Sequence, residues 1–107
     1  MSRGDLVTIA LSGDYGKPRP ALIVQANVFD ELTSVTVLRV TSELHDWPLF
    51  RITVEANMDT GLQKRSQVMV DKAATVPRSR IGQRIGSLDD GTMEAVSAAL
   101  AKFLGID

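Results

Sequence analysis

The sequence predicts a mainly β domain that ends in one C-terminal helix. Short runs rich in branched apolar residues recur from residue 5 to residue 88, and Gly, Pro, Asn or Asp residues separate them. This pattern is typical of strands joined by turns. From residue 90 to residue 104 the apolar residues follow helical spacing instead. Five or six short strands and one helix favour a small, strongly bent antiparallel sheet or a partly open barrel.

The composition is that of one folded domain spanning residues 1–107, with 44% hydrophobic and 23% charged residues. The chain has no cysteine, which excludes disulfides, thiolate metal sites and a cysteine nucleophile. No apolar run approaches the roughly 20 residues of a membrane span, so we expect a cytoplasmic protein without membrane contact. Nothing in the sequence predicts a metal site or a small-molecule cofactor.

The strands are predicted in chain order by their apolar runs, and the connections by their breakers. The predicted strands are 5–11 ("DLVTIAL"), 19–25 ("RPALIVQ"), 34–41 ("SVTVLRVT"), 49–55 ("LFRITVE"), 66–71 ("SQVMVD") and a short last one in "RIGQRIGSL". The stretch 12–18 ("SGDYGKP") is predicted to be a loop, and "ANVFDEL" a turn or a short helix. Pro77 is expected to end the element before it.

Two elements carry more detailed predictions. In 34–41, apolar residues occupy both faces, with Arg39 on the face of Val35 and Val37, so this strand is expected to be covered on both sides for part of its length. In the helix 90–104, the apolar stripe is expected to pack on the sheet. Asp89 or Asp90 can cap the N-terminus of this helix and Gly105 its C-terminus.

The charge is balanced overall but uneven along the chain. The formal net charge is −1, yet the stretch from Lys64 to Arg84 holds six basic residues and the single acid Asp71. A local basic face on a near-neutral protein can bind phosphates. Solvated surface charges explain the same pattern equally well.

Arg19 lies between two prolines, in "KPRPALIVQ", where a loop becomes an apolar strand. Proline fixes its own φ and biases the residue before it towards extended backbone, so this junction is expected to be stiff. A guanidinium offers a planar fork to a phosphate and stays charged at any working pH. An ordinary surface arginine at a strand start is the alternative.

Taken together, these segments resemble the MazF/PemK family of toxin ribonucleases. The segments that carry the resemblance run through nearly the whole chain in one order: "RGDLVTIAL", "RPALIVQ", a strand ending in "VT", "GLQKRSQVMVD", "TVPRSRIGQRIGSL" and the helix "DDGTMEAVSAALAKFLGI". The resemblance implies an SH3-like barrel, a homodimer, and metal-independent cleavage of single-stranded RNA to 2′,3′-cyclic phosphate and 5′-hydroxyl ends, which inhibits translation and growth. It also implies an antitoxin with an acidic tail and DNA binding by the toxin–antitoxin complex.

The resemblance assigns the catalytic pair to Arg19 and Thr41, with Ser42 beside Thr41. A threonine hydroxyl is a weak base on its own, so the proton acceptor stays open. Asp71 is a second candidate for it, because one relative subgroup uses the matching aspartate; a structural pair between Asp71 and a neighbouring basic residue is the alternative.

Four further residues are candidates for RNA binding: Tyr15, Lys17, Lys64 and Arg65. Tyr15 and Lys17 can stack on a base and pair with a phosphate, although both can equally be plain loop residues. His45 is expected to be a surface loop histidine and not a metal ligand. Trp47 is expected to pack, although an interface contact is possible for it.

The chain departs from the family pattern at three places, and two other functions stay open. The loop 12–18 is shorter than usual, Met69 replaces an arginine of some relatives, and "KAAT" keeps Thr75 but has Ala74 in place of an arginine. One alternative is a CcdB-like gyrase-poisoning toxin. The ending "KFLGID" of this chain faintly resembles the tail of those toxins, which carry a tryptophan at the position of Leu104. The other is an inactive family member that acts as an interaction module.

Overall fold

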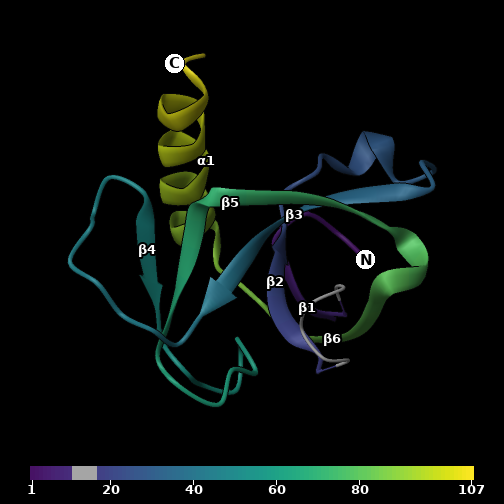
Figure 1. The fold of residues 1–107 in the computed structure, drawn as a ribbon, viewed down its shortest axis with the longest axis horizontal. Coiled ribbons are helices and arrows are strands. Elements are labelled where there is room, and N and C mark those ends of the chain that lie inside the picture. Colours follow the sequence, from purple (N-terminus) through teal and green to yellow (C-terminus); the bar gives the residue numbers. More distant parts are fainter. Residues whose placement is uncertain (11–16) are drawn as a thin grey trace.

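The computed structural model describes residues 1–10 and 17–107, which form six strands, two short 3₁₀ helices and one α-helix (Figure 1). The strands are β1 (Asp5–Ile9), β2 (Arg19–Ile23), β3 (Ser34–Thr41), β4 (Arg51–Val54), β5 (Ser66–Pro77) and β6 (Ile81–Ser87). The helices are η1 (Asn27–Phe29), η2 (Arg78–Arg80) and α1 (Asp90–Leu104). The predicted mainly β fold with one C-terminal helix is confirmed. None of the described helices is long and apolar enough to cross a membrane.

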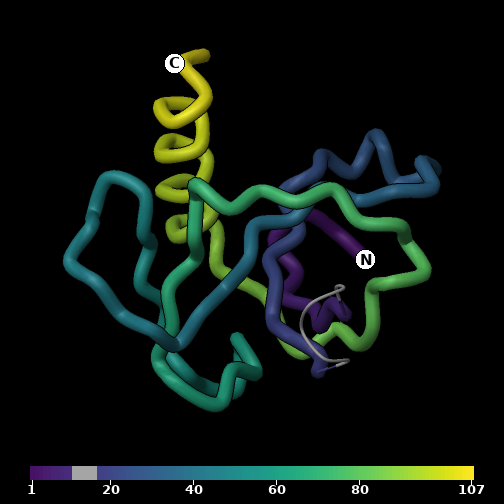
Figure 2. Tube along the Cα trace, in the orientation of Figure 1, coloured from purple at the N-terminus to yellow at the C-terminus, as the bar shows by residue number. Residues whose placement is uncertain are grey.

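The six strands form one antiparallel sheet in the order β4-β5-β3-β2-β1-β6. β4 and β6 are its two edges, and no pairing between the described strands joins them. Of the two predicted forms, the structure is therefore the open, bent sheet. Figure 2 shows how the long β5 runs from the side of the molecule that carries β4 to the side that carries β6.

Both faces of the central strands are buried, as the sequence of 34–41 predicts. Alternate residues of β1, β2 and β3 contribute to two separate apolar clusters, because successive side chains point to opposite faces. The first cluster lies under α1 and includes Leu6, Leu22, Leu38, Val68 and Val96. The second lies on the other face and includes Val7, Ala21, Ile23, Val37 and Val76.

The helix α1 has the predicted bounds and caps. The Asp89 carboxylate accepts a hydrogen bond from the Thr92 backbone N–H at 2.7 Å, and Gly105 ends the helix in the left-handed region with φ 72°. Hydrogen bonding from Thr92, above all from its backbone N–H, lowers the pKa of Asp89. Met93 and Val96 are buried, but the stripe is not covered to its end, since Phe103 is 53% exposed. The last turn extends beyond the sheet (Figure 2).

Several strand ends differ from the prediction. β5 continues to Pro77, six residues past its predicted end, because its second half pairs with β3, from Leu38 opposite Ala73 to Ser34 opposite Pro77. Only Val76 of the added half is buried, and Lys72 and Thr75 interrupt its small apolar residues, so it lacks an apolar run. β1 ends at Ile9 and β2 at Ile23, each two residues early, and β4 covers only 51–54.

Candidate active site

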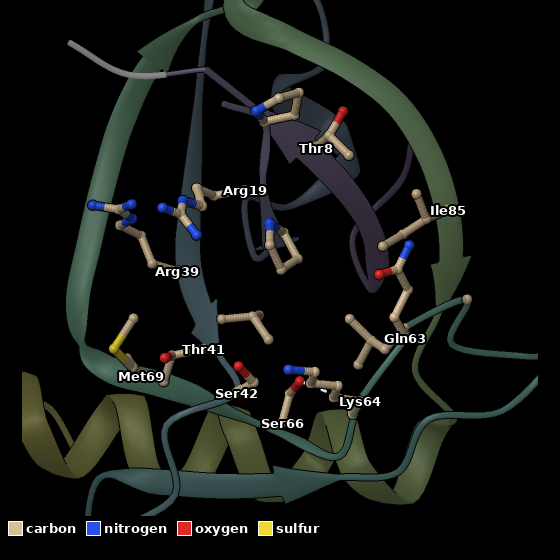
Figure 3. A pocket seen from close by; sticks show the side chains of 15 residues that line it. Thr8, Arg19, Arg39, Thr41, Ser42, Gln63, Lys64, Ser66, Met69 and Ile85 are labelled. Atoms are coloured by element: carbon tan, nitrogen blue, oxygen red, sulfur yellow. Dashed lines mark hydrogen bonds between the residues drawn. The ribbon is translucent and has the colours of Figure 1, made fainter. Parts of the chain in front are cut away.

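A hollow of about 560 Å³ opens between the ends of the central strands and the segment that precedes β5 (Figure 3). Fifteen residues line it. They are Thr8, Pro18, Arg19, Pro20, Arg39, Val40, Thr41, Ser42, Gly61, Leu62, Gln63, Lys64, Ser66, Met69 and Ile85. The sequence-predicted residues Arg19, Thr41, Ser42 and Lys64 thus meet in one place.

Arg19 is the first residue of β2 and is mounted on a stiff stretch of backbone. Both flanking prolines also line the hollow, and Pro20 pairs with Thr8 in β1. Because proline fixes φ and restricts the residue before it, Arg19 has little backbone freedom. Its side chain is exposed, and its guanidinium turns into the hollow (Figure 3).

Thr41 ends β3, on the strand next to Arg19. β2 and β3 pair with Ala21 opposite Arg39, and the same register extended by two residues sets Arg19 opposite Thr41. The Thr41 hydroxyl oxygen accepts a hydrogen bond from the Glu43 backbone N–H at 3.1 Å. This bond uses a lone pair and leaves the hydroxyl hydrogen as a donor.

The opposite wall of the hollow is the segment Gly61–Lys64, held by a tight turn. The Asn57 side-chain oxygen accepts from the backbone N–H groups of Asp59 and Thr60, both at 2.9 Å. The Thr60 hydroxyl donates to the Glu55 carbonyl at 2.8 Å. Gly61 has φ 66°, and a Cβ there would overlap the carbonyl of Ile85 in β6. Only glycine fits this close approach. The position of the turn against β6 directs Lys64 into the hollow.

Many of the side chains that line the hollow are positively charged or carry a hydroxyl group. Arg19, Arg39 and Lys64 supply the positive charge, and Thr8, Thr41, Ser42 and Ser66 supply hydroxyl groups. Among the lining residues that the structure describes there is no carboxylate. Such a hollow attracts an anion and can surround its oxygens with charge-assisted hydrogen bonds.

Comparisons with known proteins identify the family of this chain. A family model described as PemK-like, MazF-like toxin of type II toxin-antitoxin system matches residues 2–104. The chain belongs to this MazF-like toxin family. It is 48% identical to a probable endoribonuclease MazF of Mycolicibacterium smegmatis. The match runs over 107 residues and covers 99% of this chain and 98% of the relative.

Solved structures match the whole fold of this MazF-like chain. The toxin MazF-mt6 of Mycobacterium tuberculosis superposes with a TM-score of 0.82 at 28% identity, covering 96% of this chain and 98% of that one. A mycobacterial endoribonuclease in complex with its cognate antitoxin has a TM-score of 0.82 at 24% identity, covering 100% and 97%. The second likeness concerns the fold alone.

The other predicted site residues lie away from the hollow. Asp71 does not line it: one carboxylate oxygen is 3.0 Å from the Lys72 ammonium, and the other is buried without a hydrogen-bond partner among the described residues. Arg65 pairs with Glu55 at 2.8 Å on the surface. Lys17 is exposed and precedes Pro18 without lining the hollow, and Tyr15 lies outside the described residues.

The aromatic loop after β3 is a packed unit. The His45 and Trp47 rings stack with centroids 3.8 Å apart, and Arg51 lies 5.0 Å from the Trp47 ring. The buried Gln67 amide holds this loop by bonding to the backbone N–H and carbonyl of His45, at 3.1 and 2.9 Å. Trp47 therefore contacts rings of its own loop but is not a core residue, since 42% of it is exposed.

Sequence reasoning missed Arg39 as a site residue. The signal was present, because residues two apart on a strand share a face and Arg39 lies two residues before Thr41. Thr8 and Gln63 carried no such signal, since they reach the hollow only through contacts between distant parts of the chain.

Proposed function

We propose that this MazF-like chain is a toxin that cleaves single-stranded RNA in the cytoplasm, without a metal, at the hollow between β2, β3 and the segment 61–64. The observation that carries the proposal is the meeting of Arg19 and Thr41 on neighbouring strands in a cationic hollow. The high identity to a relative named a probable endoribonuclease supports it.

In the proposed reaction the 2′-oxygen of one nucleotide bonds to the adjacent phosphorus and the bond from phosphorus to the 5′-oxygen breaks. The products are a 2′,3′-cyclic phosphate and a 5′-hydroxyl, and the proton lost by the 2′-hydroxyl is balanced by the one that the 5′-oxygen gains. Arg19 neutralises the charge that grows on the phosphoryl oxygens. The Thr41 hydroxyl, with Ser42 beside it, hydrogen-bonds the phosphate or the 2′-oxygen.

The same hollow suits a protein partner of opposite charge. Its family consists of toxins of toxin–antitoxin systems. An acidic antitoxin segment laid into the hollow would meet Arg19 and Lys64 and exclude RNA by competing for the same cations. We propose this partner, together with a homodimer, as the physiological assembly.

The proposal is tested with purified protein and mixed RNA in EDTA, with mapping of the fragment ends. We expect site-specific cuts that leave cyclic phosphate and 5′-hydroxyl ends. The Arg19→Ala protein should lose about 100-fold or more of the rate, the scale seen when a transition-state charge donor is removed. It should keep its circular dichroism spectrum, because Arg19 is exposed.

The Lys102→Ala protein serves as the control. It also removes one positive charge, from the exposed last turn of α1, and should cleave like the unmodified chain. Intact RNA together with gyrase-dependent DNA breaks would show that the protein is a gyrase poison and not a ribonuclease. Intact RNA without such breaks would leave an interaction module.

A further inference from the structure

We infer that Arg39 is a second phosphate-binding residue of the hollow, which contacts the scissile phosphate together with Arg19. This inference rests on the proposed ribonuclease function. Arg39 lies in β3, is half-buried and lines the hollow. In Figure 3 Arg39 and Arg19 lie on the same side of the hollow, with the Arg39 guanidinium further out over the neighbouring strand, whereas Lys64 lies across from them.

The strand register brings Arg39 within reach of the point between Arg19 and Thr41. Ala21 lies directly opposite Arg39, so Arg19, two residues before Ala21, is the diagonal neighbour of Arg39 on the same face. Diagonal neighbours in an antiparallel pair are about 7–8 Å apart, within reach of long side chains. Thr41 follows Arg39 by two residues and shares its face.

Arg39 lies inside β3, where the ladder with β2 holds its backbone. It lies opposite Ala21 of β2 on one side, while on the other side the ladder with β5 is irregular between Leu38 and Val40, the two residues that flank Arg39. Val40, Leu62 and Met69 add apolar surface to the hollow. Charge-assisted hydrogen bonds are stronger beside such surface than in open water.

The chemistry of the substrate calls for more than one cation on this side. A phosphodiester carries one negative charge over two non-bridging oxygens, and attack by the 2′-oxygen raises the charge on both. One guanidinium engages two acceptor sites in its planar fork. A second guanidinium entering from the same side reaches the remaining lone pairs, while Lys64 across the hollow is left for a neighbouring phosphate.

The test measures the binding of an uncleavable oligonucleotide by fluorescence anisotropy. The strand carries the mapped cleavage site with a 2′-O-methyl group at the attacking position. It is made with either a natural phosphodiester or a neutral methylphosphonate at the scissile link. The proteins are the unmodified chain, Arg39→Ala, Arg39→Lys and the charge control Lys102→Ala.

We expect Arg39→Ala to bind the phosphodiester strand about tenfold or more weakly, the effect of losing a hydrogen bond to a charged group. It should also discriminate less between phosphodiester and methylphosphonate than the unmodified chain does. The slope of log K against log salt concentration should be shallower by about 0.7, which is the contribution of one phosphate contact in a single strand. Arg39→Lys should recover the salt dependence but only part of the affinity, because it lacks the planar fork.

A purely structural Arg39 would give a different result. Arg39→Ala would then show the discrimination and the salt dependence of the unmodified chain, whatever its affinity, and this result would overturn the inference. Failure of the unmodified chain to cleave RNA, or to prefer the phosphodiester, would overturn the proposed function instead.

Discussion

Thr41 and Asp71, the two candidates for the proton acceptor, have different surroundings. The Thr41 hydroxyl lies in the hollow on the strand next to Arg19, whereas the Asp71 carboxylate is paired with Lys72 outside it. Geometry comes before basicity in choosing a group for proton transfer. At the scale of the residue, the structure therefore favours Thr41 as the group that touches RNA and a structural role for Asp71.

This difference predicts opposite outcomes for substitutions at the two residues. Thr41→Ala should lower the cleavage rate about 100-fold, because a hydrogen bond to the reacting group is lost, and Thr41→Ser should restore much of it. Asp71→Asn should stay within about threefold of the unmodified chain, because a partly exposed ion pair contributes little. Single-turnover cleavage rates compare the three proteins.

A folded Asp71→Asn protein without activity would reverse the assignment and make Asp71 the proton acceptor. A Thr41→Ala protein that cleaves at the full rate would remove Thr41 from the reaction.

At the scale of the element, the wall that carries Lys64 depends on the close approach of the turn 57–61 to β6. Gly61 has a positive φ and lies against the Ile85 carbonyl, and Gly86 lies against the backbone of Asp59 and Thr60. The Asp59 carbonyl accepts the Ser87 backbone N–H at 2.9 Å. A side chain at either glycine would separate the turn from β6 and move Lys64.

Gly61→Ala should therefore lower the free energy of unfolding by about 2 kcal/mol or more, combining the cost of a positive φ with steric overlap. It should also weaken RNA binding at temperatures where the protein stays folded. The matched control is Gly91→Ala in α1, where the new Cβ meets only the Asp89 side chain at 3.5 Å. That change should be neutral or stabilising, because alanine favours a helix.

Thermal unfolding followed by circular dichroism measures both glycine variants. Equal melting temperatures for Gly61→Ala and the unmodified chain would contradict the close approach.

The elements with a regular period were the predictable ones. The strand 34–41 and the helix 90–104 have the predicted bounds, because two buried faces and one apolar stripe leave clear patterns. The second half of β5 was missed, because Lys72, Ala73 and Thr75 are exposed and leave no apolar pattern. The hollow itself was not predictable, because its far wall comes from pairing between β1 and β6 and from the turn that β6 supports.

At the scale of the whole molecule, the positive charge that matters is local. The chain has a formal net charge of −1, so overall attraction does not bring it to RNA. Three cations line a hollow whose described lining lacks carboxylates, and they are carried by a sheet with an apolar cluster on each face. Recognition should therefore depend on this one site, with a modest salt dependence set by few phosphate contacts.

The most direct test of the proposed function removes one oxygen atom from the substrate. An RNA oligonucleotide with a single mapped cleavage site is compared with the same strand carrying a 2′-deoxy sugar at the attacking nucleotide, in EDTA. We predict that the all-RNA strand is cut to a 2′,3′-cyclic phosphate and a 5′-hydroxyl, while the deoxy strand binds with similar affinity and stays intact. Cleavage of the deoxy strand at the same link would contradict the proposed reaction, because no 2′-oxygen would be present to attack.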